Sequence, residues 1–401
     1  MSRGTGRPAD AAGAWLAEHG DDLVALRRHL HAHPELGRAE HDTTALLTQR
    51  LAEAGLAPKP LDVATGLTCD VGGGDGPLIV LRADIDALPL HDDKDVPYRS
   101  TVPGVCHACG HDVHTAAVLG AGLALAAYDA DHRLPGTVRL VFQPAEEQMP
   151  GGALDVIAAG RVAGAALALS LHCDPTLTCG QIGVKSGALT SAADRIEVHL
   201  SGPGGHTSRP YRTVDLVQAL ASVATDVPAA LARRVDARSG VSLVWGAVSA
   251  GTAHNAIPDS GVLRGTVRML DRSAWAETPT LLTELVTGVA ALFGATARVD
   301  YVRGVPPVVN DPRSTSLLAH AAEAVLGTRA VVATTQSLGG EDYAWYLEQV
   351  PGTMFRLGVR PPGFVGRDLD LHQGSFDVDE DAIAVAVRVL VRGALDALDL
   401  D

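Results

Sequence analysis

The sequence predicts an α/β protein: a main domain with a mixed, mostly parallel sheet, and a smaller inserted α+β domain. Three observations support this. Short, strongly apolar strands alternate with helical segments in roughly the first 185 residues. Several of these strands end abruptly in acidic residues or histidine. After about residue 185, the strands alternate between apolar and polar residues, as in a half-exposed sheet.

The main domain begins with two helical patterns. Residues 14–33 have helical periodicity and stop at Pro34, and residues 41–54 stop at Gly55. Strand patterns then follow at 65–73, 77–84, 136–143 and 165–172. In parallel sheets, function gathers at the strand ends. The ends of the last three strands carry polar side chains, namely Asp84, Asp86, Glu146, Glu147 and His172.

The inserted domain is predicted from the order of its elements. Strand patterns at 194–202, 241–251, 260–270 and 295–302 are interrupted by helical patterns at 213–231 and 273–294. This β-α-β-β-α-β order is that of the ferredoxin-like unit. We therefore place the inserted domain at 186–300, between the two parts of the main domain, 1–185 and 301–401. A helix over 379–398 closes the chain.

Composition excludes some functions. The 401 residues carry a formal net charge of -15, which argues against binding to nucleic acid. We recognise no signal peptide and no run of about 20 apolar residues, so no membrane partner is expected. The five cysteines are few, odd in number and scattered, which is not a disulfide framework. A cytoplasmic location is expected.

The stretch GVCHACGHDVHTA, residues 104–116, concentrates two cysteines, three histidines and an aspartate. It fits a redox pair, half of a structural zinc site, or one edge of a metal-dependent active site. Structural zinc usually needs two close pairs of ligands, and the other close pair, Cys173 and Cys179, has the wrong spacing. The neighbouring His and Asp are unusual for a thioredoxin-like pair. The pattern disfavours the first two interpretations but leaves all three open.

Other strand ends extend the set of possible metal ligands. In QPAEE, Glu146 and Glu147 point to opposite sides of extended chain, so one could bind a metal and the other could reach a water if the chain turns there. Histidines follow at the end of another apolar strand and near the end of the chain. The combined donors suit zinc, manganese or cobalt better than calcium or magnesium: Cys109, His111, Glu147, His172 and His372.

Ten motifs resemble, in order and spacing, those of the dinuclear-metal aminoacylase and carboxypeptidase family. They are HAHPELG, RADIDALPL, HACGHDVHTA, QPAEE, LHCDP, GGHTSRP, HNAIPD, GTVR, GGEDYAWY and LHQGSF. They lie within roughly residues 24–385, nearly the whole chain. The chain is most similar to the amidohydrolase branch, which includes hippurate hydrolases, auxin-conjugate hydrolases and N-acyl-amino-acid amidohydrolases. The resemblance implies a metal-binding catalytic domain and an inserted lid or dimerisation domain.

The resemblance also implies two divalent metal ions per subunit, held by the five donors above. Cys109 would replace an aspartate that bridges the two metals in related branches. Cys106 would be a bystander, because the family usually has Met there. Asp86 would orient a metal ligand. Glu146 would be the general base that takes a proton from water and passes it to the leaving amine.

Further residues, most of them in the inserted domain, are implied to act on the substrate. His206 would be a catalytic residue, and in dimeric relatives its equivalent reaches the site of the partner subunit. Asn255 and Arg268 would hold a free carboxylate, which suits the fork of an arginine. Gly339 and Gly340, in the turn 339–342, would line the acyl pocket.

We expect hydrolysis of the amide bond of N-acyl amino acids or related conjugates, releasing a free amino acid and a carboxylic acid. The alternatives are a dipeptidase or carboxypeptidase acting on small peptides, and a non-catalytic metal-binding module. Retention of Glu146 argues against the second. The enzyme is expected to act on small molecules as a homodimer or higher homo-oligomer. Tyr211, where the family often has His, receives no role.

Overall fold

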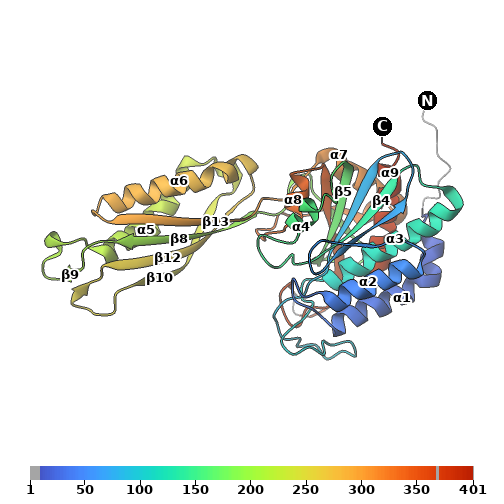
Figure 1. Cartoon of the computed structure of the whole chain (residues 1–401), viewed down its shortest axis with the longest axis horizontal. Coiled ribbons are helices and arrows are strands. Elements are labelled where there is room, and N and C mark those ends of the chain that lie inside the picture. Colours follow the sequence, from blue (N-terminus) through green and yellow to red (C-terminus); the bar gives the residue numbers. More distant parts are fainter. Residues whose placement is uncertain (1–9, 367–369, 401) are drawn as a thin grey trace. The chain divides into compact units, whose positions relative to one another are not determined.

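The computed structural model describes residues 10–366 and 370–400. The expectation that the chain has no signal peptide rests partly on residues 1–9, which lie outside these ranges. The chain divides into two compact units (Figure 1). Unit 1 comprises Met1–Gly187, Asn310–Thr335 and Trp345–Asp401, and unit 2 comprises Ala188–Val309 and Gln336–Ala344. The catalytic and lid roles expected of the two domains stay predictions.

Unit 1 is built on an eight-stranded sheet of order β1-β2-β4-β3-β5-β16-β6-β15. β3 runs parallel to β4 and β5, β5 to β16, and β6 to β15, whereas the other neighbours are antiparallel. The predicted mixed, mostly parallel sheet is thus confirmed. The strands are β1 (Lys59–Pro60), β2 (Leu67–Gly72), β3 (Leu78–Asp84), β4 (Thr137–Gln143), β5 (Ala165–Thr178), β6 (Ile182–Val184), β15 (Val331–Ala333) and β16 (Gly352–Arg360).

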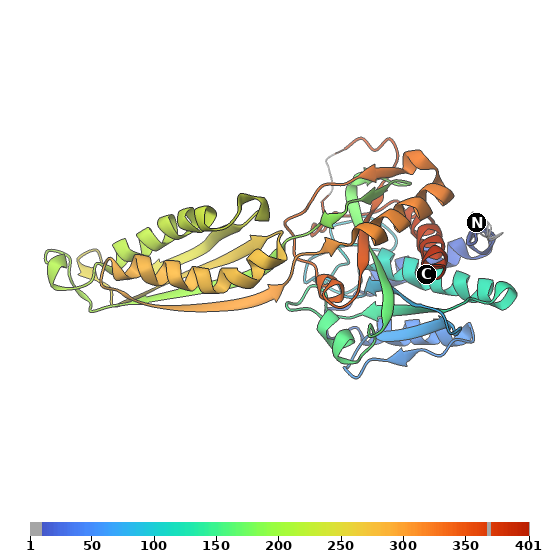
Figure 2. The ribbon, with the colours of Figure 1, turned by 90° about the horizontal axis from the view of Figure 1, so that it is seen from above.

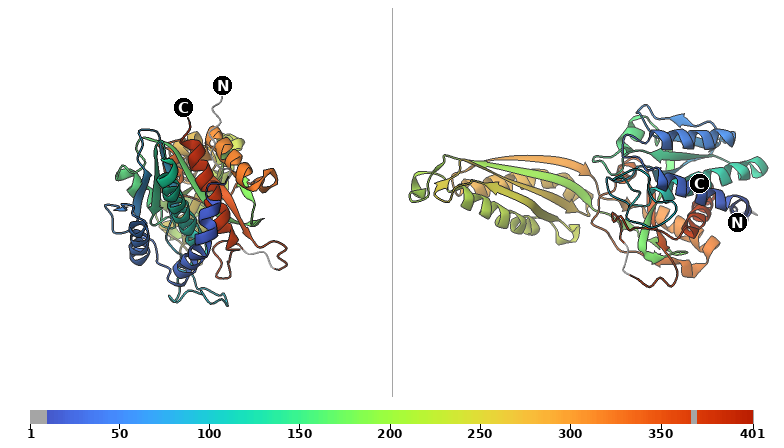
Figure 3. Two further views of the ribbon diagram at one scale, coloured as in Figure 1. Left: turned by 90° about the vertical axis from the view of Figure 1, so that its right-hand side faces the viewer. Right: turned by 90° about the horizontal axis from the view of Figure 1, so that it is seen from below.

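The central strands are apolar because helices cover the sheet. Nearly every residue of β3 and β16 is buried, as is usual for strands covered on both faces. Three helices, α1 (Gly13–Ala32), α3 (His111–His132) and α9 (Asp381–Ala397), pack side by side (Figure 3). The remaining helices of this part are α2 (His41–Glu53), α4 (Ala153–Ala158), α7 (Pro312–Leu326) and α8 (Ala344–Leu347), with a short 3-10 turn, η3 (Thr328–Ala330).

Helix α3 is the most apolar of the three. Among the described residues, it is the one helix that is long and apolar enough to cross a membrane by length and composition. This helix contradicts the expectation that the chain has no such run of apolar residues. Two thirds of its most apolar window, 67%, is buried inside the protein. Its composition is therefore explained by its place in the core.

Unit 2 has the ferredoxin-like order predicted from the sequence. Its antiparallel sheet has the order β10-β12-β8-β13, and α5 and α6 pack together on one face (Figure 2). Asp215 and Asp271 begin these helices by accepting hydrogen bonds from the backbone N–H three residues later. The elements are β8 (Ala192–Ser201), α5 (Leu216–Arg234), β10 (Ser242–Ala250), β12 (Ser260–Met269), α6 (Arg272–Ala291) and β13 (Thr296–Val305).

Short elements complete the description. β9 (Gly205–His206) pairs with β11 (Ala256–Ile257), and two 3-10 turns, η1 (Pro210–Arg212) and η2 (Ala237–Ser239), flank α5. β7 (Gly187–Ala188) and β14 (Val309–Asn310) lie where the chain passes from one unit to the other.

Candidate metal centre

Three parallel strands bring the predicted ligands to one edge of the unit 1 sheet. Asp84, the last residue of β3, lies opposite Gln143, the last residue of β4. Arg82 of β3 lies opposite Ser170 of β5. The residues that follow these pairs therefore meet at the same edge, which is where open α/β sheets place their functional groups. They include Asp86, Glu146, Glu147 and His172.

The glycine between the candidate ligands Cys109 and His111 adopts a conformation that other residues rarely take. Gly110, between Cys109 and His111, precedes α3 with φ of 87°, a left-handed conformation that glycine adopts without strain. A Cβ at this position would lie 2.7 Å from Cys173 Sγ. The glycine thus allows the loop to approach β5 closely, directly beside the candidate ligands.

All five predicted ligands are brought together. Cys109 Sγ lies 3.5 Å from His172 Nε2, and Glu147 Oε1 lies 3.3 Å from His372 Nε2 and 4.0 Å from His111 Nε2. Donor atoms of Cys109, Glu147 and His372 all lie within 4.8 Å of one another. The set therefore has the proximity that metal coordination requires.

Backbone carbonyls fix the orientation of two imidazoles. His111 Nδ1 donates to the carbonyl oxygen of Asp86 over 2.9 Å, and His172 Nδ1 donates to that of Cys173 over 2.8 Å. Because each Nδ1 is used as a donor to a carbonyl oxygen, each Nε2 is the nitrogen that remains for a metal. This is the arrangement that metal-binding histidines normally have.

The turn that carries Glu146 and Glu147 is held by two buried carboxylates. Asp86 accepts from the backbone N–H groups of both glutamates, over 3.1 and 3.0 Å. Glu40 accepts from the N–H of Ala145 over 2.8 Å, where φ is 55°. The chain therefore turns between the two glutamates and β4, as metal binding by one of them requires. Asp86 orients this turn and also lies 3.3 Å from His111 Nδ1.

His372 enters the centre from a loop that precedes α9. Its backbone has φ of 61° and its N–H donates to the carbonyl oxygen of Ala108 over 2.8 Å. Hydrogen bonds to Cys109 and Glu147, together with their negative charges, raise the pKa of His372 to about 10. The centre therefore favours positive charge at this point.

The donors fit divalent metal ions. His111 Nε2 is buried and has no hydrogen-bond partner within the described residues, and the buried Glu147 Oε1 has only the ion-pair distances to His372 and His111 given above. Buried polar atoms are rarely left without a partner, and metal coordination would satisfy His111 Nε2. Burial raises the pKa of the Cys109 thiol, whereas a metal ion would hold the sulfur as a thiolate. A mixed set of sulfur, nitrogen and oxygen donors suits zinc, cobalt or manganese.

The predicted catalytic residue His206 and the predicted substrate-binding residues fall into two groups in unit 2. His206 and Asn255 are neighbours, since β9 pairs with β11 and the N–H of Thr207 donates to the carbonyl of Asn255. Arg268 lies near the opposite end of β12, where its Nη1 donates to Leu338 O over 2.5 Å. The eight residue-to-residue steps from Ser260 to Arg268 span about 27 Å of extended strand.

Gly339 and Gly340 belong to the Arg268 end of unit 2. The carbonyl oxygen of Gly339 accepts from the N–H of Ser191, just before β8. Asn255 and Arg268, expected to hold one carboxylate together, are therefore separated within a single chain. Tyr211 is 78% exposed, near His206 in the sequence, with the Arg212 guanidinium over its ring.

The two cysteines of the motif belong to different clusters. Cys106 is buried beside Lys94, whose Nζ lies 3.7 Å from its sulfur and 2.8 Å from Asp92. Asp92 in turn lies 3.3 Å from His31 Nε2. The ammonium group of Lys94 already supplies this cluster with a cation. Cys106 and Cys109 therefore do not act as a pair, which argues against a redox site or a structural zinc site.

Sequence reasoning gave no role to three buried residues around the centre. Glu40 holds the glutamate turn, and Asp84 and His114 contact each other over 2.6 Å between Oδ1 and Nδ1. His114 follows His111 by one helical turn, and this spacing could have indicated that the two side chains lie on the same face of α3. Glu40 lies at the start of α2, over 100 residues before the turn that it holds, so no local pattern reveals it.

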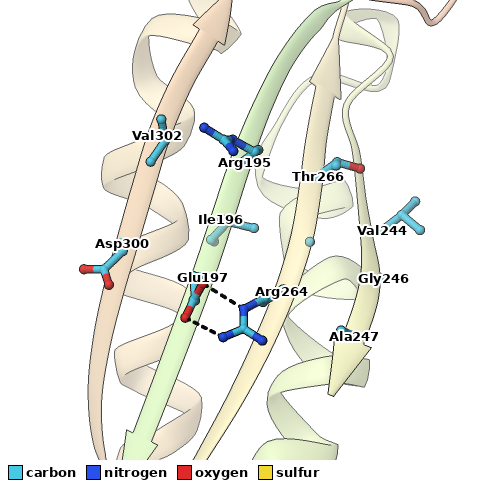
Figure 4. Close-up of a pocket in the computed structure, with 11 residues that line it drawn as sticks. Arg195, Ile196, Glu197, Val244, Gly246, Ala247, Arg264, Thr266, Asp300 and Val302 are labelled. Atoms are coloured by element: carbon cyan, nitrogen blue, oxygen red, sulfur yellow. Dashed lines mark hydrogen bonds and ion pairs between the residues drawn. The ribbon is translucent and has the colours of Figure 1, made fainter. Parts of the chain in front are cut away.

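A separate hollow lies on the face of the unit 2 sheet that α5 and α6 leave uncovered (Figure 4). Arg264 donates to both oxygens of Glu197 over 2.9 and 3.2 Å along its floor. Its lining differs from the predicted site residues and consists of Arg195, Ile196, Glu197, Val244, Gly246, Ala247, Arg264, Gly265, Thr266, Asp300 and Val302. The donors for metal chemistry lie in unit 1.

The chain is similar in sequence to known proteins over most of its length. A Rhodococcus jostii protein named glutamate–cysteine ligase 2-3 is 47% identical over 369 residues, which cover 92% of this chain but 46% of that protein. The N-acetyl-L-cysteine deacetylase of Bacillus subtilis is 36% identical over 378 residues, covering 94% of this chain and 88% of the relative.

A solved structure extends the similarity to the fold. The Bacillus subtilis YxeP protein, a dinuclear metal-binding peptidase of family M20, aligns with a TM-score of 0.83 and 33% identity. The alignment covers 96% of this chain and 99% of that one. The model for peptidase family M20/M25/M40 matches residues 80–396. The chain therefore belongs to peptidase family M20/M25/M40, in the amidohydrolase branch that the motifs indicated.

Proposed function

We propose that this chain is a metal-dependent amidohydrolase that cleaves N-acyl amino acids or related conjugates into a carboxylic acid and a free amino acid. One observation carries the proposal. A carboxylate oxygen of Glu146 lies within 4.8 Å of donor atoms of both His111 and Glu147, at the edge of the donor set. A base beside a metal centre is a combination that can hydrolyse an amide by activating a water molecule.

The roles follow from the donors. Cys109, His111, Glu147, His172 and His372 would hold two divalent ions, zinc, manganese or cobalt. Such ions act as Lewis acids that polarise a carbonyl and lower the pKa of water. Glu146 would take the proton from the attacking water and deliver it to the nitrogen of the leaving amine. Asp86 keeps Glu146 in place through the backbone of the turn.

The substrate class is supported by a relative and by the residues of unit 2. The Bacillus subtilis deacetylase is named for N-acetyl-L-cysteine, an N-acyl amino acid. We propose that Arg268 and Asn255 bind the free carboxylate, and that Gly339 and Gly340 line the acyl pocket. Dipeptidase or carboxypeptidase activity is the second candidate, because the structurally similar YxeP protein is described as a peptidase.

We further propose that a second copy of the chain completes the site. His206 and Asn255 are exposed and lie at the opposite end of unit 2 from Arg268. Strand β10 is an edge strand beside an apolar groove that includes Val217, 51% exposed, and Val248, 67% exposed. An open edge with apolar neighbours favours pairing with another chain. In such a homodimer, His206 and Asn255 would serve the partner.

The state of the cysteines supports a proposal about the cellular compartment. Cys69, Cys106, Cys109, Cys173 and Cys179 are all free thiols in the structure. We therefore propose a reducing compartment, the cytoplasm. Fractionation of the native host, with the protein found outside the cytoplasm, would contradict this.

The test is hydrolysis of a panel of acetyl, benzoyl and long-chain N-acyl amino acids, with N-acetyl-L-cysteine and dipeptides included. Metal-stripped protein is resupplied with zinc, manganese or cobalt. Glu146→Gln should lower kcat/KM by about 100- to 10,000-fold while metal content stays unchanged. Glu53→Gln, on the exposed side of α2, is the control. Turnover on dipeptides alone would favour the peptidase, and no turnover on either class would reject the proposal.

A further inference from the structure

His114 and Asp84 form a buried pair directly behind the donor set. Asp84 ends β3 and His114 lies in the first turn of α3, and both side chains are fully buried. Asp84 Oδ1 accepts from His114 Nδ1 over 2.6 Å, and Asp84 Oδ2 accepts from Arg82 Nη1 over 2.7 Å. Since Nδ1 carries the proton, His114 Nε2 is an acceptor.

This acceptor binds the strand that carries His172. The N–H of Cys173 donates to His114 Nε2 over 2.9 Å, and the carbonyl oxygen of Cys173 accepts from His172 Nδ1 over 2.8 Å. The pairing of β3 with β5 ends at Ser170. Beyond that point β3 no longer supplies partners, and a buried N–H needs one. The imidazole of His114 takes the place of the missing strand.

We propose that Asp84 and His114 are positioning residues for the metal ligand His172. The chain Arg82–Asp84–His114–Cys173 N fixes the backbone of β5 at this ligand. The rings of His114 and His172 are also in contact, with centroids 5.3 Å apart. Together these contacts direct His172 Nε2 towards Cys109 Sγ. This inference rests on the metal centre of the proposed function.

An additional metal site at Asp84, His111 and His114 is the competing explanation, because their donor atoms lie within 4.8 Å of one another. The hydrogen bonds argue against it. Arg82 and His114 engage the two oxygens of Asp84, and the N–H of Cys173 engages the free nitrogen of His114. These donors are therefore committed to the protein, and their role is to orient His172.

The experiment is titration of the metal-stripped protein with Co²⁺. Equilibrium dialysis measures the number and affinity of the bound ions, and the thiolate-to-cobalt absorption band reports the coordination by Cys109. Wild-type protein should bind two ions. His114→Phe keeps a buried ring but loses both hydrogen bonds. It should lower the affinity for one of the two cobalt ions about 10- to 100-fold and change the absorption band. His114→Gln keeps one donor and one acceptor and should restore most of the affinity. Asp84→Asn, which loses the charge, should fall between them.

Leu390→Ala is the control for loss of stability alone. Leu390 is fully buried in the apolar core of unit 1, on α9. It should lower stability and leave cobalt binding unchanged. Wild-type affinity and absorption in His114→Phe, or an equal loss in Leu390→Ala, would overturn the inference. If His114→Phe does not fold, the cobalt affinities of Asp84→Asn and His114→Gln are compared instead, and Asp84→Asn should bind one ion more weakly.

The proposed function can fail separately. Wild-type protein that binds two cobalt ions but hydrolyses no substrate would reject the function and leave the positioning role to be judged by affinity. Wild-type protein that binds no cobalt would overturn both, because there would be no ligand to position.

Discussion

Two residues beside the candidate metal centre adopt backbone conformations that L-amino acids rarely take. Ala145, before the glutamate turn, has φ of 55°, and His372 has φ of 61°. Each such residue costs on the order of 1–2 kcal/mol. Each is held by a hydrogen bond from its own N–H, to Glu40 and to Ala108 respectively. Such strained residues persist where surrounding contacts determine the conformation, and they cluster at functional sites.

Gly110 provides a prediction at this scale. Gly110→Ala places a Cβ 2.7 Å from Cys173 Sγ at φ of 87°. The conformation costs about 1–2 kcal/mol, and the crowding adds about 1–3 kcal/mol. Urea unfolding of the metal-stripped protein measures the sum. Gly160→Ala, at φ of 68° with no atom within 4 Å, carries only the conformational cost. Equal losses of unfolding free energy in the two variants would mean that the loop moves away from Cys173 at no cost.

At the scale of elements, local pattern predicted much of the molecule. The apolar runs of β3, β4 and β5, each ending in polar residues, indicated both the sheet and the edge that carries Asp86, Glu146 and His172. The alternation in β8 indicated a half-exposed strand, and five of its ten residues are buried in alternate positions. Periodicity reports which face of an element is buried, so it succeeds where burial alone sets the pattern.

The remaining contacts depend on distant parts of the chain. Glu40 bonds to Ala145 across 105 positions, and His114 bonds to Cys173 across 59. These polar partners interrupt no local pattern. The separation of Asn255 from Arg268 was equally hidden, because the direction of β12 follows from its pairing with β8. Two motifs implied by one resemblance to serve one carboxylate thus lie at different ends of a strand.

The pair β2–β4 provides a prediction for the sheet. Asp70 lies directly opposite Arg139, which donates to both its oxygens over 2.7 and 2.9 Å. Burial alone would raise the pKa of Asp70, but the hydrogen bonds and charge of Arg139 outweigh it and the pKa is lowered. A lowered carboxylate pKa stabilises the fold above the unfolded value of about 3.9. That contribution is lost as pH falls from there through the folded pKa.

Asp70→Asn should therefore lower the free energy of unfolding by about 1 kcal/mol at pH 7, the size of a half-exposed cross-strand pair. The difference from wild type should stay constant down to about pH 5 and shrink below about pH 4. Urea unfolding at pH 7, 5, 4, 3 and 2.5 measures it. Asp75→Asn, on an exposed loop of unit 1, is the control. A difference that grows at low pH would contradict the role of Arg139.

At the scale of the whole molecule, the donors sit on the edge of a unit that has a large core of its own. Most buried apolar residues of unit 1 form one cluster over α1, α3, α9 and the sheet. Removal of metal should therefore abolish activity and leave the far-ultraviolet circular dichroism intact. The unfolding temperature should rise with metal concentration, as for any ligand of the folded state. Loss of cooperative unfolding on chelation would instead indicate a structural zinc protein.

The arrangement of unit 2 leads to a prediction about pairs of chains. If Glu146 acts in its own chain and His206 in the partner's site, Glu146→Gln and His206→Ala are each inactive alone. In the mixed dimer, the site with an intact Glu146 receives an intact His206 from the other chain. After subunit exchange, half of the dimers are mixed and each has one working site, so about a quarter of wild-type activity should return.

The control for exchange is a chain that carries both substitutions, mixed with either single variant. None of its pairings completes a site, so no activity should return. Activity that stays absent in the first mixture, with mixed dimers shown by tagged chains, would place both residues in the same chain's site. The separation of His206 and Asn255 from Arg268 along unit 2 would then have to be closed within one chain, and the second copy would have no catalytic role.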